Sequence, residues 1–187
     1  MLKKIIALSL ALLMLLCAAS CNKKNSDVPE DMKSATLAGE PFLLYVPVSW
    51  SVNTGSGVSG AYVSPNDKIM VSARYFPPAD PTMTVDDYVT LCAEGYKSRE
   101  GFAITERISA VLGGKDALKL TYTVTDNGKA MTCFQITALH NGDMIPLYGY
   151  CPSEMWEVRS EEFNKIASEF RFCDKTDPQG EVVVDKN

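Results

Sequence analysis

Few side chains in this sequence could carry out acid–base or nucleophilic chemistry, and the histidine is the first to consider. His140 is the single histidine of the 187 residues, and it directly precedes Asn141-Gly142, a dipeptide typical of a tight hairpin turn. We predict that His140 is a solvated surface residue. A catalytic triad or zinc site needs oriented partners, and the sequence has no G-x-S-x-G elbow, phosphate-binding glycine loop or zinc helix motif.

Paired acidic residues are the next candidates for chemistry. Asp86-Asp87 and Glu161-Glu162 are both predicted at helix starts, where carboxylates interact favourably with the helix dipole. A glycosidase-like pair is a minor alternative. Asp126-Asn127-Gly128 resembles part of a calcium loop but lacks the remaining ligands, so we assign it to a hairpin. We therefore expect no enzymatic activity, no cofactor and no metal, unless acids converge with His140 in a cleft.

Four cysteines follow the N-terminal segment, and their spacing matches no C-x-x-C metal or redox motif. They are Cys92, Cys133, Cys151 and Cys173. Three full disulfide pairings are possible, and buried free thiols are the alternative. The sequence leaves this choice open.

The first 21 residues predict export from the cytoplasm. Lys3 and Lys4 precede an apolar run, and the small residues 18–20 lead into Cys21, which together indicate a secretory signal peptide over residues 1–20. About 13 apolar residues are too few for a membrane span, which needs ~20. Small residues before a cysteine resemble the lipobox of bacterial lipoproteins, and this resemblance implies that Cys21 carries a lipid. An ordinary secreted protein with a free Cys21 thiol is the alternative.

Charge and composition divide the rest of the chain. Removal of residues 1–20 takes away two lysines and lowers the formal net charge from −5 to −7, which argues against nucleic acid and anionic lipid as partners of the domain surface. Residues 21–33 are predicted as a polar tether, 34–173 as one folded domain and 174–187 as a flexible tail. Within the tail, residues 182–184 could pair with another strand.

The first half of the domain is predicted as three strands and a helix. Residues 42–46, 60–64 and 69–76 have the composition of strands. Thr84 and the acids after it form a capping box variant, and apolar residues then recur at helical spacing to Ser98. This pattern places Cys92 on the buried face of the helix.

The second half predicts four antiparallel strands joined by tight turns, beginning with residues 104–112, 115–125 and 130–139. At Asp126-Asn127-Gly128 we predict a three-residue bulged loop, because it sets Leu120 opposite Phe134 and Leu118 opposite Ile136. At Asn141-Gly142 a two-residue turn sets Ile136 opposite Leu147 and Ala138 opposite Ile145. In that register Cys133 faces Tyr150 and Cys151 points to the other side, which disfavours a disulfide between these two thiols.

A closing helix and the aromatic residues complete the prediction. Phe163, Ile166, Ala167 and Phe170 form a helical stripe, with Trp156 in the lead-in to this helix. Most aromatic side chains are expected in the core, and any left exposed would be anchors for a partner. Trp156 and Trp50 are the candidate interaction residues; the tyrosines considered with them are Tyr45, Tyr62, Tyr75, Tyr148 and Tyr150.

Three segments resemble those of the Mog1/PsbP-like proteins, which include DcrB-type bacterial lipoproteins. They are residues 42–47 with Trp50, residues 114–117 before a tyrosine-containing strand, and residues 166–170. The resemblance covers nearly the whole domain and implies an α+β fold, in which an antiparallel β-sheet is flanked by helices as an α/β/α sandwich. It also implies a scaffold for protein interaction, but no functional residue is transferred, because function does not follow from a fold.

Together these features predict a lipid-anchored binding or assembly module without catalytic activity. It would lie in the bacterial cell envelope, held on the membrane through Cys21 and facing outward, with an envelope protein as partner. The alternative is a small-molecule-binding lipoprotein with a pocket between sheet and helix. An apolar cavity lined by Tyr75, Tyr122 or Trp156 would favour this alternative, whereas a flat exposed aromatic patch would favour the assembly module.

Overall fold

The computed structural model describes residues 28–55, 57–63, 66–78, 80–176 and 182–184. Its elements are β1 (Met32–Ser34), β2 (Phe42–Leu43), β3 (Tyr45–Pro47), β4 (Ser51–Val52), β5 (Ser59–Tyr62), β6 (Met70–Ala73), α2 (Val85–Tyr96), β7 (Ala103–Leu112), β8 (Lys115–Asp126), β9 (Lys129–His140), β10 (Asp143–Pro152), the 3-10 turn η1 (Ser153–Met155), α3 (Trp156–Ser168), β11 (Arg171–Thr176) and β12 (Val182–Val184). The predicted signal peptide, Cys21 and most of the predicted tether lie outside the described residues.

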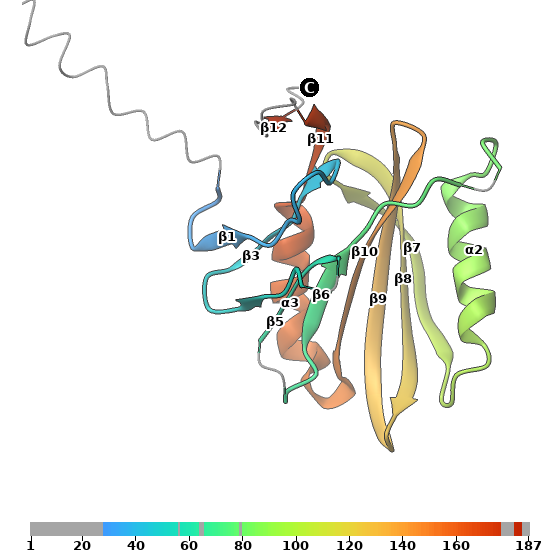
Figure 1. The fold of residues 1–187 in the computed structure, drawn as a ribbon. Helices are drawn as coiled ribbons and strands as arrows, with labels where there is room; N and C mark the ends of the chain where they lie inside the picture. The colour runs from blue at the N-terminus through green and yellow to red at the C-terminus, as the bar shows by residue number, and fades with distance from the viewer. Residues whose placement is uncertain (1–27, 56, 64–65, 79, 177–181, 185–187) are drawn as a thin grey trace, which may run out of the picture.

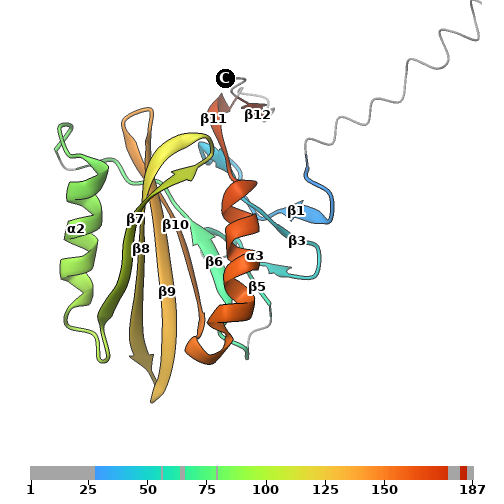
Figure 2. The same cartoon turned by 180° about the vertical axis from the view of Figure 1, so that it is seen from behind.

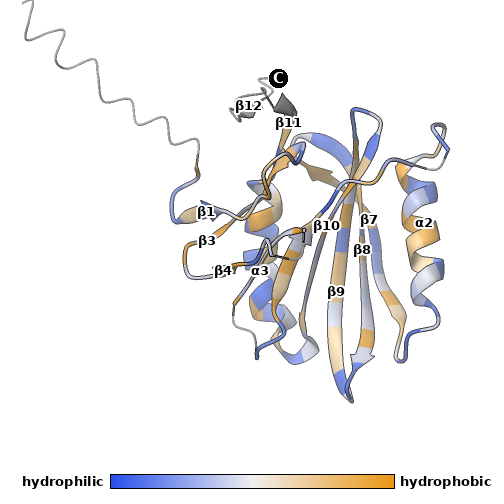
Figure 3. Cartoon of the chain, in the orientation of Figure 1, coloured by the Kyte–Doolittle hydropathy of each residue, from blue (hydrophilic) through white to orange (hydrophobic). Residues whose placement is uncertain are grey.

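The centre of the fold is an antiparallel sheet with one helix on each face. Its strand order is β4-β5-β6-β10-β9-β8-β7, with α2 on one face and α3 on the other (Figures 1 and 2). Both helices alternate hydrophilic and hydrophobic bands (Figure 3), as expected when one side of a helix packs on a sheet. The predicted α+β fold is confirmed. Within the described ranges, no helix is both long enough and apolar enough to cross a membrane.

The four long strands follow one another through two-residue turns. Asn141 and Gly142 both have positive φ, as the favoured tight hairpin turn requires. The predicted register of this hairpin is confirmed, because Ile136 pairs with Leu147 and Ala138 with Ile145. Cys133 and Cys151 therefore point to opposite faces.

The predicted bulged loop at Asn127-Gly128 is wrong. Asp126 pairs directly with Lys129, and Leu120 lies opposite Gln135 rather than Phe134. The prediction assumed that apolar residues of the two strands share one buried face. Strand β9 is instead buried on both faces, so Gln135 can lie in the interior, where its Nε2 donates to Thr137 Oγ1 at 2.9 Å.

Helix α2 begins as predicted and buries a narrow face. The Thr84 hydroxyl accepts from the Asp87 amide, and the Asp87 carboxylate accepts in return from the Thr84 amide, which completes a capping box. Val89 and Ala93 are the buried residues of the helix. Cys92 is only half-buried, because it lies to the side of that face.

Helix α3 packs on the sheet through the predicted stripe, with Phe163, Ile166 and Ala167 buried. The helix begins earlier than predicted, at Trp156, so Glu161-Glu162 lies in its second turn and not at its start. The dipole explanation for this pair is therefore wrong. Glu162 accepts instead from Trp50 Nε1 at 2.9 Å and from Arg159 at 2.7 Å.

The folded part extends beyond the predicted domain limits at both ends. Met32 is buried and pairs with Pro47, so regular structure begins before Ser34. Strand β11 continues past Cys173 and pairs with β2 on one side and β12 on the other. The valines of residues 182–184 thus form a strand, as their composition allowed.

Candidate binding groove

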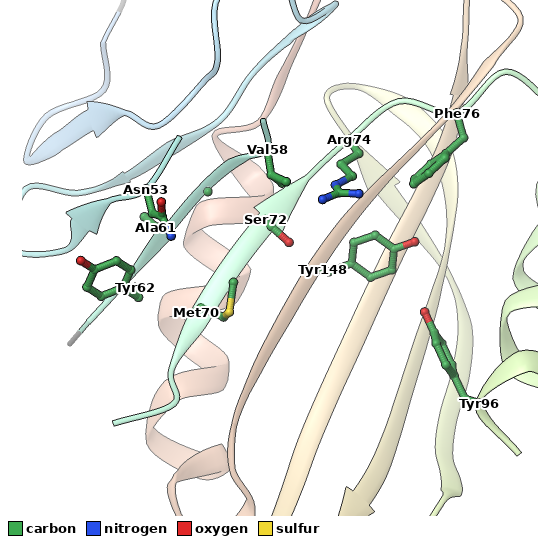
Figure 4. A pocket seen from close by; sticks show the side chains of 11 residues that line it. Asn53, Val58, Ala61, Tyr62, Met70, Ser72, Arg74, Phe76, Tyr96 and Tyr148 are labelled. Atoms are coloured by element: carbon green, nitrogen blue, oxygen red, sulfur yellow. The ribbon is translucent and has the colours of Figure 1, made fainter. Parts of the chain in front are cut away.

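A groove lies beside α2, on the part of the sheet that this helix leaves uncovered. Helix α2 contacts β8 and β9. Strands β5, β6 and β10 follow β9 in the sheet, on the side away from β7. A hollow of about 460 Å³ lies over these three strands, with Tyr96 of α2 as its wall. Figure 4 shows Tyr148 of β10 and Ser72 of β6 between Tyr96 of α2 and Ala61 of β5.

Small residues in register create the floor of the groove. Gly60 pairs with Ser72, and Ser72 pairs with Tyr148, so these three positions form one row across β5, β6 and β10 and share a face. A Cβ on Gly60 would lie 3.0 Å from the Val71 carbonyl oxygen. The missing and short side chains therefore leave open the space that larger residues would fill.

Tyrosines form the helix side of the groove and continue beneath the helix. The Tyr88 phenol lies near Tyr148 and that of Tyr96 near Tyr122, close enough to influence each other's pKa. The Tyr96 and Tyr122 rings stack with centroids 4.9 Å apart. Burial raises the pKa of Tyr88 to about 12 and also raises the pKa of Tyr148 and Tyr122. At neutral pH these phenols are therefore uncharged hydrogen-bonding groups.

A second hollow of about 290 Å³ shares Tyr148 with the groove and is lined by Arg99, Cys133 and Tyr150. Burial raises the pKa of the Cys133 thiol to about 11, so this thiol stays protonated and is a poor nucleophile at neutral pH. Cys92, Cys133 and Cys151 are free thiols. Among the described residues, no group of three His, Cys, Asp or Glu side chains could hold a metal ion.

Arg74 supplies positive charge at one end of the groove. It lines the groove together with Phe76, and both also line a neighbouring hollow of about 400 Å³ that contains Glu40. Burial raises the pKa of the Glu40 carboxyl, and the nearby Arg74 guanidinium opposes this rise. Arg74 is in none of the six ion pairs of the described residues, and Glu40 is the acidic residue that shares a hollow with it.

The prediction that His140 is a solvated residue is wrong. Its side chain is 2% exposed, its Nε2 lies 3.1 Å from the Cys173 carbonyl oxygen, and its ring stacks on Phe172. The reason is that β11 covers the end of β9, a long-range contact that the local turn motif does not indicate. His140 lies outside the groove and has a structural role.

Neither tryptophan lines the groove. Trp50 is 1% exposed and its ring packs edge-on against Phe163, so its choice as an interaction residue is wrong. Trp156 is half-buried against Phe134 and Phe163 and lines none of the three hollows described above.

Two residues named from the sequence as aromatic candidates do line the groove, Tyr62 and Tyr148. Arg74 was not named, and Tyr96 was covered only by the apolar pattern predicted for the helix that ends near Ser98. The available signal was the small pair Gly60 and Ser72 in predicted strands, because small residues in a sheet leave room for a ligand. That Gly60 and Ser72 lie side by side becomes clear only from the pairing register of β5 with β6.

Comparison with known proteins rests on structure alone. No protein-family model and no curated protein sequence matches the chain. LpqN of Mycobacterium tuberculosis, "involved in cell envelope biogenesis", has a TM-score of 0.54 at 19% identity, over 75% of this chain and 89% of that one. Cyanobacterial PsbP (CyanoP) from Synechocystis has a TM-score of 0.54 at 14% identity, over 81% and 98%. The Ran-binding protein Mog1p from Saccharomyces cerevisiae has a TM-score of 0.54 at 6% identity, over 75% and 95%. The chain therefore has the Mog1/PsbP-like fold.

Proposed function

We propose that the protein is a lipid-anchored binding or assembly module of the bacterial cell envelope that performs no catalysis and binds an envelope protein in the groove beside α2. Two neighbours support a binding role in the envelope, since LpqN is described as involved in cell envelope biogenesis and Mog1p as Ran-binding. The buried position of His140 and the high pKa of the Cys133 thiol also favour binding over chemistry.

The observation that carries the proposal is the uncovered, tyrosine-lined part of the sheet. Tyr62, Tyr96 and Tyr148 line the groove with Met70 and Phe76, so apolar surface and phenol groups lie together. Tyrosine is enriched at the energetic centres of protein interfaces because it combines a large apolar ring with a hydrogen-bonding group. The structure shows a groove rather than the flat exposed aromatic patch expected of an assembly module, and a groove with apolar surface and hydrogen-bonding groups can accept a segment of a partner protein.

Photo-cross-linking in native membranes tests the proposal. A benzoylphenylalanine at Tyr62, which lines the groove, is expected to capture one discrete partner, identified by mass spectrometry. The matched control is the same photoreactive residue at Val158, which is 73% exposed on α3 and so on the other side of the sheet. Tyr148→Phe should weaken capture from Tyr62. Equal capture from both sites, or none from Tyr62, would contradict the groove as the partner site.

A small molecule is the second candidate occupant. The volume of about 460 Å³ falls within the ~300–1,000 Å³ of typical ligand pockets, and Tyr122 lines the adjoining hollow, as this alternative anticipated. Native mass spectrometry of the protein extracted from its membrane distinguishes the two. A retained compound that is lost in Ser72→Phe, together with no captured protein, would favour the small molecule.

Anchoring is tested independently of the groove. Labelled palmitate is expected to enter the native protein and to be absent from Cys21→Ala, because the proposed lipid is attached to that thiol. Label that persists in the variant would contradict the lipobox assignment and leave the binding proposal standing.

A further inference from the structure

Strand β7 forms one edge of the sheet, and its outer side has unpaired backbone groups. The Gly113-Gly114 turn has positive φ at both residues and pairs Leu112 with Lys115, a geometry in which the closing pair is hydrogen-bonded. Hydrogen-bonded and non-hydrogen-bonded pairs then alternate along an antiparallel ladder. The N–H and C=O groups of Arg107, Ser109 and Val111 therefore point away from β8.

No other described element takes up these groups, since the backbone–backbone hydrogen bonds between described elements include none from Arg107, Ser109 or Val111. The neighbouring hairpin gives the same alternation. Asp126 pairs with Lys129 across Asn127-Gly128, so the residues of β8 that bond to β9 alternate with those that bond to β7. Strand β7 is thus a free edge along 107–111.

Along residues 107–111 this edge lacks the features that usually protect a free strand. Natural edge strands are short, carry proline or outward charges, or are bulged. Strand β7 has ten residues with neither proline nor lysine, and its bulge lies between Ile104 and Glu106, outside the segment 107–111. Its two charged residues are already engaged, Arg107 with Asp86 at 2.8 Å and Glu106 with Lys119 at 3.0 Å. Ile104 and Ile108 are each 46% exposed and Val111 is 63% exposed. The edge is therefore apolar and able to pair.

We propose that β7 pairs antiparallel with β7 of a second copy of this chain, about a two-fold axis through Ile108. This register sets Arg107 opposite Ser109 of the second copy, so that these two residues exchange both backbone hydrogen bonds. By the two-fold symmetry, Ser109 of the first copy pairs with Arg107 of the second in the same way. Ile108 meets its own copy in a non-hydrogen-bonded pair, where side chains are closest.

Charge and apolar contact favour this register over the two that are shifted by one residue. An axis through Arg107 would place two arginines directly opposite one another, which is destabilising. An axis through Ser109 would set Ile108 against Ala110 and lose the isoleucine pair. With the axis at Ile108, Glu106 lies opposite Ala110 of the second copy and no like charges oppose. The pairing thus joins the sheets of the two copies edge to edge and leaves the groove of each copy open.

Disulfide cross-linking of the full-length protein in its native membrane tests the pairing. In Ile108→Cys the two new Cβ atoms would lie about 4.5–5.5 Å apart, and mild oxidation should give a dimer on a non-reducing gel. The matched control is Val111→Cys on the same strand, because its two copies would be on the order of 20 Å apart at ~3.3 Å per residue. The unsubstituted protein corrects for its own thiols, of which Cys92 is the most exposed in the described part.

The proposal predicts a dimer yield from Ile108→Cys at least tenfold above that from Val111→Cys. Adding Ser109→Pro should abolish this yield, because it removes an outward N–H and leaves the bonds to β8 in place. Circular dichroism confirms that the double variant is folded, and Ser109→Lys is the substitute if it is not. Equal yields at the two positions, no dimer from Ile108→Cys, or a yield unaffected at Ser109 would each overturn the proposal.

Discussion

The two faces of the sheet differ in composition and in completeness of packing. On the α3 face, one large apolar cluster contains Phe42, Trp50, Phe134, Phe163 and Phe170 with many aliphatic residues. On the α2 face, the cluster is small and joins Val89 and Ala93 to tyrosines and Cys133, and it adjoins two hollows. Dense apolar packing supplies stability, so the α3 face should contribute most of the stability of the domain.

The α2 face is the more polar side of the sheet and adjoins the groove. Gln135 is fully buried, and its Oε1 has no hydrogen-bond partner among the described residues. An unsatisfied buried acceptor costs roughly 1–3 kcal/mol. Phenols at Tyr88, Tyr96 and Tyr148 add polar groups at the edge of the helix. Such a face is less stabilising but offers hydrogen bonds to a partner.

The largest effect is expected from Trp50→Ala. This change removes a buried aromatic ring from the α3 face and the donor to Glu162, and should lower the free energy of unfolding by about 3–5 kcal/mol. Urea denaturation followed by circular dichroism measures it. A loss below about 1 kcal/mol would contradict the assignment of stability to this face.

Gly149→Ala should be the next most damaging change. A Cβ at this position would overlap the ring of Phe134, which also packs against Trp156 and Phe163. Overpacking of this kind costs about 1–3 kcal/mol, measurable as a shift of the urea midpoint.

The same substitution at Gly95 is the matched control for Gly149→Ala. Gly95 is in α2, and nothing lies within 4 Å of the place that a Cβ would occupy there. Alanine at this position should stabilise the protein by roughly 0.5–1 kcal/mol because it favours the helix. If both substitutions changed the free energy of unfolding in the same direction, crowding at Phe134 would not be the cause of the loss in Gly149→Ala.

Val89→Ala measures the strength of the α2 face. Loss of two methylene-sized groups at ~0.8 kcal/mol each predicts a cost of about 1.5 kcal/mol, well below that of Trp50→Ala. Amide hydrogen exchange should quicken in α2 and much less in α3. Leu91→Ala, at a residue 61% exposed on the same helix, should change stability by less than about 0.5 kcal/mol. A larger cost for Val89→Ala than for Trp50→Ala would reverse the comparison.

Alkaline pH should also weaken the α2 face. The pKa of Tyr88 rises from 10.0 to about 12 on folding, so the folded state holds its proton more tightly than the unfolded state. This contribution to stability is complete below pH 10 and is lost as the pH rises to about 12. Tyr88→Phe should flatten the fall in stability over pH 10–12, measured by urea denaturation at each pH. An unchanged slope would contradict a role for Tyr88.

Much of the fold follows from local patterns. The capping box at Thr84, the turn at Asn141-Gly142 and the stripe through Phe163 and Ile166 were predictable, because each depends on residues close in sequence. The register at Asn127-Gly128 was not, because the choice depended on whether β9 is covered on one face or on both. Coverage of a strand by two helices is a property of the whole sheet.

The groove beside α2 was only partly predictable for the same reason. Tyr62 and Tyr148 could be named as aromatic candidates, but Trp50 could not be recognised as buried until its indole was placed against Glu162 of α3. The row of Gly60, Ser72 and Tyr148 joins three strands whose pairing spans the length of the domain. No local pattern reports such an arrangement.

By itself, the sequence determined the type of each long element, the α+β class and the likeness to Mog1/PsbP-like proteins, since propensity, caps and apolar periodicity act over a few residues. Only the tertiary structure decided that His140 is buried, that α2 leaves β5, β6 and β10 uncovered, and that β7 has a free edge. These features arise from contacts between residues far apart in the chain. Their free energy depends on which surfaces meet, and that is settled only when the layers pack together.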